Sequence, residues 1–156
     1  AEKRFEKVEP LPAVGSGKTK GLSRSMYMGD WNALPDFGAL SSTETGVCDS
    51  IGLGLDKFPE YAGLRLSGTM SVSATSVFRF ALNSDDGSRL WIDGVLVVDN
   101  DGLHGPVSKV GAIALAKGAH VLRLDYFNKT GGSALKLSWA QSGGGFEEVP
   151  AKAYRH

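Results

Sequence analysis

Two adjacent carboxylates follow a strand-like stretch of the sequence. Asp85 and Asp86, in SDDGSRLWIDG, come directly after the apolar alternation of VFRFALN. Neighbouring negative charges repel each other unless a cation lies between them. Because successive strand residues point to opposite sides, the chain must bend sharply here before both carboxylates can reach one ion. The pair is therefore either part of a calcium site or an acidic turn whose side chains cap nearby amides.

A calcium site needs more oxygens than this pair supplies. Calcium takes about six to eight oxygen ligands at roughly 2.3–2.6 Å. The others must come from loops that are distant in sequence but near in space. In a β-sandwich, loops at the same end of different strands are the natural source, and the candidates are DNDGLHG (99–105) and NKTGGS (128–133). Composition and spacing alone leave the metal site and the turn both open.

Apolar residues alternate with polar ones along most of the chain after Tyr61, as in GLRLSGTMSV, HVLRLDYFN and ALKLSW. This period of two is typical of half-buried strands. Asp93-Gly94 between two apolar runs indicates a hairpin with a two-residue turn. About six or seven short strands separated by turns predict an all-β, antiparallel sandwich or barrel-like fold.

A single domain is expected from the length of 156 residues. Residues 1–20 are polar and predict an N-terminal tail or linker, 21–150 the domain, and 151–156 a C-terminal tail. Turn residues dominate 29–60, which indicates an irregular loop insertion. The 17 basic and 17 acidic side chains cancel, so the sequence predicts no nucleic-acid partner, and no apolar run is long enough for membrane insertion.

A specific ordered set of segments resembles the PA-fourteen domain family, the protective-antigen-type β-sandwich, from about residue 21 to 140. The segments are YMGDW, LPDF, YAGLRLSGTMSV, FRFALNSDDGSRLWIDGVLVVDNDGLHG, GAIALAKGAHVLRLDYFN and GGSALKLSWA. The resemblance implies a compact, barrel-like sandwich of the kind appended to glycosidases, adhesins, toxins and other surface proteins. It further implies a place outside the cell or in the cell envelope, within a larger multidomain protein.

The resemblance also implies a calcium site. In the lectin-like members, adjacent aspartates joined by a cis peptide bind calcium together with an amide side chain from a later loop, and vicinal sugar hydroxyls complete the coordination. By position, Asp85 and Asp86 match the pair and Asn128 matches the amide, with main-chain carbonyls of Thr130, Gly131 and Gly132 as further ligands. The implied function is non-catalytic, calcium-dependent glycan binding, weak at each site. The alternative is a structural or protein-interaction module without a sugar ligand, in which the pair shapes the loop.

Three further side chains are candidates for ligand contact. Trp31 belongs to the loop insertion that can reach over a binding site, and its alternative role is packing. Asp101 follows the VLVV strand, where turn formation is the alternative. His104 is a possible hydrogen-bond donor to a ligand, and its alternative role is to brace the loop.

The remaining aromatic and titratable residues suggest structural roles. Trp91 alternates with Leu90 and is expected on the less buried face, whereas Trp139 follows the inward alternation and is expected in the core. His120 begins a strand and is expected to be structural. Adjacent aspartates without an apolar pocket to keep one of them protonated do not fit glycoside hydrolysis, so the sequence predicts no enzyme activity.

Overall fold

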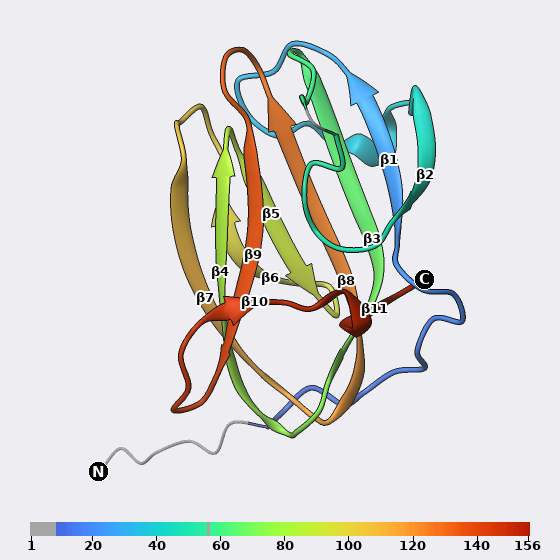
Figure 1. Cartoon of the computed structure of the whole chain (residues 1–156), viewed down its shortest axis with the longest axis vertical. Helices are drawn as coiled ribbons and strands as arrows, with labels where there is room; N and C mark the ends of the chain where they lie inside the picture. The colour runs from blue at the N-terminus through green and yellow to red at the C-terminus, as the bar shows by residue number, and fades with distance from the viewer. Residues whose placement is uncertain (1–8, 56) are drawn as a thin grey trace.

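Two antiparallel β-sheets form a sandwich in the computed structural model, which describes residues 9–55 and 57–156 (Figure 1). The larger sheet has the order β2-β1-β3-β8-β5-β6, with β11 also paired to β3, and the smaller has the order β10-β9-β4-β7. The larger sheet contains β1 (Leu22–Met28), β2 (Glu44–Cys48), β3 (Ala62–Val72), β5 (Ser88–Ile92), β6 (Val95–Asn100), β8 (Gly118–Asn128) and β11 (Tyr154–Arg155). The smaller contains β4 (Ser76–Asp85), β7 (Val107–Leu115), β9 (Ala134–Gln141) and β10 (Glu147–Glu148). The predicted all-β sandwich is confirmed, and the described residues include no helix long and apolar enough to cross a membrane.

The apolar faces of the two sheets form the core. Leu64, Leu66 and Met70 of β3 are fully buried, as are Phe80 and Leu82 of β4. These residues occupy alternate positions, which is the pattern expected when one face of each sheet meets the other. Each such side chain contributes about 1.5–3 kcal/mol through burial.

The hairpin between β5 and β6 has the predicted two-residue turn. Asp93 and Gly94 both have positive φ, 50° and 79°, as a type I′ turn requires. Asp93 Oδ1 accepts a hydrogen bond from the Val121 amide (2.8 Å), and Oδ2 lies 2.6 Å from His120 Nδ1. The other ring nitrogen of His120 donates to the Ala116 carbonyl (2.7 Å). His120 is fully buried and has the predicted structural role.

The C-terminal residues are part of the sheet, so the prediction of a tail at 151–156 is wrong. After the 3-10 helix η2 (Ala151–Ala153), Tyr154 pairs with Met70 of β3 and is only 2% exposed. β1 pairs with β3 only as far as Ser67. β11 therefore occupies a length of β3 that β1 leaves unpaired, and it satisfies backbone groups there.

The N-terminal segment also lies against the sandwich where it is described. The Leu11 amide donates to the Ala114 carbonyl (3.0 Å), and the Val14 amide donates to the Ala119 carbonyl (2.8 Å). The prediction of a tail therefore does not hold for residues 9–20, because their amides bond to the sheet. Residues 1–8 lie outside the described part of the chain.

The predicted irregular insertion at 29–60 contains two short elements, η1 (Phe37–Ala39) and β2. β2 pairs with the edge of β1, and four of its five residues are exposed. An exposed edge strand shows no alternation of apolar and polar residues, which is why its sequence, ETGVC, gave no strand signal. The other described residues of the insertion, up to 55 and from 57 to 60, are irregular, as predicted.

Candidate functional site

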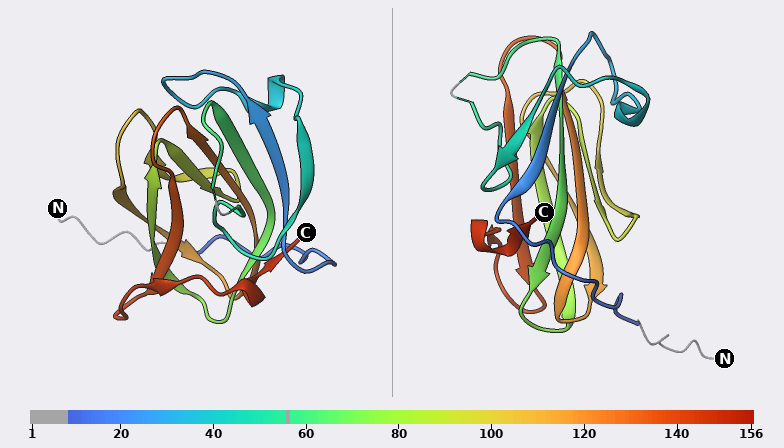
Figure 2. Two further views of the ribbon diagram at one scale, coloured as in Figure 1. Left: turned by 45° about the horizontal axis from the view of Figure 1, so that its top comes forward. Right: turned by 90° about the vertical axis from the view of Figure 1, so that its right-hand side faces the viewer.

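The predicted site residues meet at one end of the sandwich, at the top of Figure 1 and facing the viewer in the left panel of Figure 2. Asp85 is the last residue of β4 and pairs with Ala134, the first residue of β9. Asn128 is the last residue of β8 and pairs with Ala62, the first of β3. Because antiparallel neighbours begin where their partners end, loops that are far apart in sequence come together here.

Asp86 ties two of these loops together. The Asp85–Asp86 peptide bond is cis. Asp86 is 8% exposed, and its Oδ1 accepts a hydrogen bond from the His104 amide (3.3 Å), whereas its Oδ2 accepts one from the Lys129 amide (2.9 Å). The carboxylate is thus fixed by the backbone of both loops that were predicted to supply ligands.

Asp85 differs from its neighbour because its carboxylate has no hydrogen bond or ion pair within the described residues. Its main-chain carbonyl accepts a hydrogen bond from the Tyr126 hydroxyl at 2.6 Å. Burial raises the pKa of Asp85, the negative charge of Asp86 raises it further, and His104 partly opposes both effects. A partly buried carboxylate beside a second negative charge is a favourable place for a cation.

Asn128 presents a buried oxygen without a donor. The side chain is fully buried, and its Nδ2 donates to the Pro59 carbonyl (3.2 Å), which fixes the orientation of the amide. Within the described part of the chain, Oδ1 has no hydrogen-bond partner. The flanking amides bond to the Asp85–Asp86 turn: Phe127 to the Gly87 carbonyl (3.0 Å) and Lys129 to Asp86. An orphaned buried acceptor costs about 1–3 kcal/mol, which a bound cation would offset.

The glycine-rich loop after Asn128 borders the same carboxylates. A methyl group on Gly132 would lie 3.5 Å from Asp85 Oδ2, and the Gly131 amide donates to Glu60 Oε2 (2.8 Å). A hollow of about 670 Å³ separates this loop from residues 57–60. Glu60 was not predicted, because a lone carboxylate before β3 carries no sequence signal of its loop-binding role.

Gly87, directly after the Asp85–Asp86 pair, allows the chain to pack closely against Asp101, Gly102 and Phe127. A Cβ at this position would lie 2.7 Å from Asp101 Oδ1, from the Gly102 amide nitrogen and from Phe127 Cε1. Real side chains do not approach backbone and ring atoms so closely, so a larger residue would displace the turn.

The ligand chemistry of this end is that of a hard cation. Among the residues that the structure describes, no three His, Cys, Asp or Glu side chains cluster as a metal site. The oxygen atoms of Asp85, Asp86 and Asn128, with main-chain oxygens nearby, suit calcium, whereas zinc prefers nitrogen and sulfur. The chemistry of these residues therefore fits the ion that the family resemblance implies.

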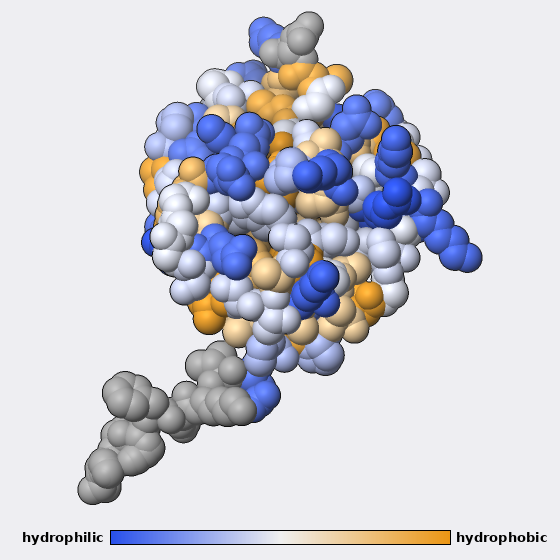
Figure 3. Space-filling view, turned by 60° about the horizontal axis from the view of Figure 1, so that its bottom comes forward, coloured by the Kyte–Doolittle hydropathy of each residue, from blue (hydrophilic) through white to orange (hydrophobic). Residues whose placement is uncertain are grey.

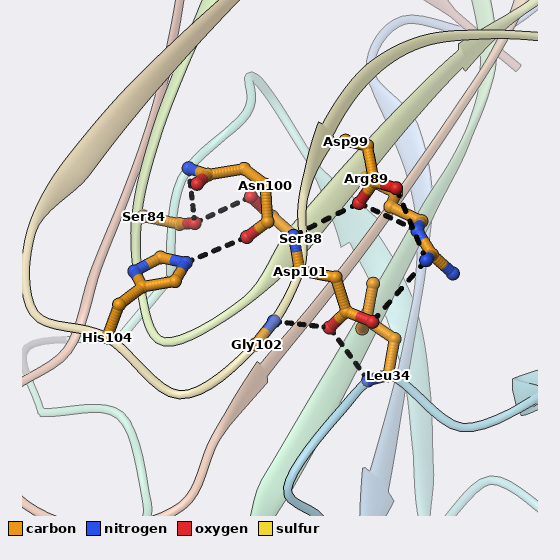
Figure 4. A network of polar contacts seen from close by, with 9 residues as sticks. All are labelled: Leu34, Ser84, Ser88, Arg89, Asp99, Asn100, Asp101, Gly102 and His104. Atoms are coloured by element: carbon orange, nitrogen blue, oxygen red, sulfur yellow. Dashed lines mark hydrogen bonds and ion pairs between the residues drawn. The ribbon is translucent and has the colours of Figure 1, made fainter.

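In the structure, Asp101 has the role that was the alternative to ligand contact: it forms hydrogen bonds within a turn (Figure 4). Its Oδ1 accepts hydrogen bonds from the Leu34 and Gly102 amides, each at 2.8 Å, and its Oδ2 lies 3.6 Å from Arg89 Nη2. Arg89 also binds Asp99 through two hydrogen bonds. Both oxygens of Asp101 are therefore engaged by the protein, as in the turn-forming role, and its contact with a ligand stays a prediction.

His104 likewise has its alternative role, which is to stabilise the loop rather than to contact a ligand. One ring nitrogen lies 2.8 Å from the Gly105 carbonyl and the other 2.8 Å from the Asn100 carbonyl. Asn100 in turn donates to the Leu82 and Val107 carbonyls at the ends of β4 and β7. Neither ring nitrogen of His104 is left to donate to a ligand, since both face main-chain carbonyl oxygens.

Trp31 lies in a loop attached to the site by Lys129. The Lys129 ammonium group donates to Asn32 Oδ1 (2.6 Å) and lies 3.3 Å from Asp30 Oδ1. The indole packs edge-on against Phe37, with ring centroids 5.7 Å apart, and remains partly exposed. Its contact with a ligand stays a prediction.

Comparison with known proteins identifies the family and the fold. The PA14 domain family matches residues 19–153. A PA14 sugar-binding domain from an RTX adhesin superposes with a TM-score of 0.75 at 18% identity, covering 89% of this chain and 99% of that one. The A domain of epithelial adhesin 9 from Candida glabrata, in complex with Galβ1-4GlcNAc, gives a TM-score of 0.69 at 13% identity and covers 94% of each chain. At such identities these structures show the shared fold.

A curated relative points to a different context. Anti-sigma-I factor RsgI3 of Acetivibrio thermocellus is 26% identical over 89 residues, which is 56% of this chain and 14% of that protein. The present chain therefore spans a small part of this longer relative. The matched proteins thus include both sugar-binding domains and an anti-sigma factor.

Proposed function

Because the chain belongs to the PA14 domain family, we propose that it is a non-catalytic, calcium-dependent carbohydrate-binding module. Asp85, Asp86 and Asn128 would hold the ion, with main-chain carbonyls of Thr130, Gly131 or Gly132 as additional ligands. A bound calcium ion would supply open coordination positions for two neighbouring hydroxyls of a sugar.

The observation that carries this proposal is the buried, partnerless Oδ1 of Asn128. Turn formation alone explains Asp86, which binds two amides. It explains neither an amide oxygen without a donor nor the free carboxylate of Asp85 at the same strand ends. A cation accounts for both.

The protein's own groups prepare the site for a ligand. Asp86 is held by two backbone amides, and Asn128 is oriented by the Pro59 carbonyl, so neither has to reorganise on binding. The hollow lined by residues 57–60 and the loop 131–133 leaves room for a sugar, and Gly132 in its lining lies next to Asp85. The sugar-binding adhesin domains with the same fold support this class of ligand.

Binding at one such site is expected to be weak, because an open surface hollow buries little of a sugar. Useful affinity would come from several copies or from clustered glycans. This suits a module of a larger protein that acts outside the cell or in its envelope, which is part of the proposal.

Calorimetric titration with calcium, followed by a glycan array with calcium or with EDTA, tests this function. We expect one bound ion and glycan signals that EDTA abolishes. An ion without any glycan signal would favour the structural or protein-interaction module. The proposal would be refuted if the protein bound no calcium ion and gave no calcium-dependent glycan signal.

A further inference from the structure

A second hollowed region lies at the opposite end of the sandwich, which faces the viewer in Figure 3. Gln141 ends β9, whereas Ala134 at the start of the strand pairs with Asp85. At about 3.4 Å per residue, the two strand ends are roughly 24 Å apart. Two hollows, of about 410 and 270 Å³, meet here and share Ser73, Trp139 and Glu147 as lining residues.

Trp139 is the centre of this cleft. The indole packs against the core through Phe78 and Phe80, with ring centroids 6.0 and 6.4 Å away, but it is only partly buried and borders both hollows. The prediction that Trp139 is a core residue therefore holds for only part of the ring. Its pairing partner in β10 is Glu147, which lies at the outer edge of the smaller sheet and leaves the indole at an open rim.

Polar side chains converge around the indole. Within the described residues, Ser73, Gln141 and Glu147 have no side-chain hydrogen bond or ion pair. Lys152 lines the larger of the two hollows, so the cleft carries one negative and one positive side chain. A hydroxyl, an amide and two opposite charges around an aromatic ring form a lining without net charge that can both donate and accept hydrogen bonds.

The loop between β9 and β10 forms one wall of the cleft, and Arg79 holds this loop in place. The connection between β9 and β10 includes Gly144 and Gly145, which line the smaller hollow with bare main chain. Arg79 donates from Nη2 to the Gly144 carbonyl (3.3 Å), and its guanidinium lies 4.8 Å from the centroid of the Phe146 ring. These contacts hold the loop beside the cleft.

We propose that this cleft is a second, calcium-independent binding site for a neutral oligosaccharide. The indole offers a flat apolar surface for the C–H face of a sugar ring, and the surrounding side chains are matched to its hydroxyls. The balanced charge disfavours strongly anionic or cationic ligands. Two hollows that share Trp139 suit a chain longer than a single sugar. The site shares no residue with the calcium-dependent function proposed above.

Titration of the full chain with neutral hexasaccharides in EDTA tests this inference. Cellohexaose, xylohexaose and mannohexaose are added at millimolar concentration while the tryptophan indole N–H signals are followed by nuclear magnetic resonance. Trp139→Phe assigns the Trp139 signal. We expect at least one sugar to shift that signal and to leave those of Trp31 and Trp91 unchanged.

Matched variants locate the site. Glu147→Ala is expected to weaken binding about threefold to tenfold, the effect of one lost hydrogen bond. Glu148→Ala, at the neighbouring position outside the cleft, should bind as the wild type does. Asp85→Asn should also retain binding, because this variant breaks no side-chain hydrogen bond within the described residues and changes only the calcium-dependent end.

Three results would overturn the inference: no shift of the Trp139 signal with any of the sugars, equal weakening by the two glutamate variants, or loss of binding in Asp85→Asn. None of them affects the calcium proposal. Conversely, failure of the calcium titration leaves this result standing.

Discussion

Separate replacement of the two adjacent aspartates by asparagine distinguishes a cation site from an acidic turn. The carboxylate of Asp86 accepts two amide hydrogen bonds, whereas the carboxylate of Asp85 has none within the described residues. If the two aspartates only shape the loop, replacing Asp86 lowers the stability of the protein and replacing Asp85 does not. If the pair holds an ion, both variants lose the ion but only one loses stability without it.

The magnitudes follow from these contacts. In Asp86→Asn one acceptor oxygen becomes an amide nitrogen, so either the His104 or the Lys129 amide loses its partner. A hydrogen bond to a charged group contributes about 1.5–3 kcal/mol. Since either substitution removes the same repulsion, we expect metal-free Asp86→Asn to be about 2 kcal/mol less stable than metal-free Asp85→Asn. Asp85→Asn breaks no side-chain hydrogen bond and removes the repulsion from Asp86, so its metal-free stability should equal or exceed that of the wild type.

Calcium should stabilise only the wild type. At a calcium concentration of about 100 Kd, linkage adds roughly 2.7 kcal/mol, which for a domain of this size raises Tm by about 5–10 °C. Thermal unfolding of the three proteins in EDTA and in calcium measures both effects. An equal loss of stability by both variants in EDTA, or an undiminished calcium shift in Asp85→Asn, would refute the reasoning.

Tyr126→Phe removes the hydroxyl that donates to the Asp85 carbonyl and should cost about 1 kcal/mol in urea unfolding; an unchanged midpoint would contradict this. Gly87→Ala should lower Tm and abolish calcium binding together, because its Cβ would clash with Asp101 and Phe127; calorimetry that shows normal binding would contradict the packing argument. In EDTA, the raised pKa of Asp85 means that the folded state binds more protons than the unfolded state above pH 3.8. Wild-type stability relative to Asp85→Asn should therefore fall as pH rises from that value through the folded pKa, as urea unfolding across this range can show.

The sandwich could be predicted because its central strands have one buried and one less buried face. Leu64 and Leu66, or Phe78 and Phe80, alternate with polar residues and end in the core. β2 and β11 could not be found in this way. β2 is an exposed edge strand, and β11 is a two-residue strand held by long-range pairing and by the burial of Tyr154.

The site could be predicted only in part. The Asp85–Asp86 pair can be recognised in the sequence because two acidic residues are adjacent. Asn128 was predicted as a ligand only through the family resemblance. What the sequence does not reveal is which oxygens the protein itself uses. Asp101 and His104 looked available, but the fold engages them with backbone groups. Such contacts depend on where distant loops meet, and local pattern carries no record of that.

Two loops at the proposed calcium end, 128–133 and the one that contains Leu34, are fastened by acidic side chains of other loops. Asp86 holds Lys129, Glu60 holds Gly131, and Asp101 holds Leu34. A graft of residues 129–133 from another protein would therefore fail unless the recipient's anchors at positions 60 and 86 suited it. A new ligand specificity is more readily obtained by exchanging exposed side chains on these connected loops than by transplanting one loop alone.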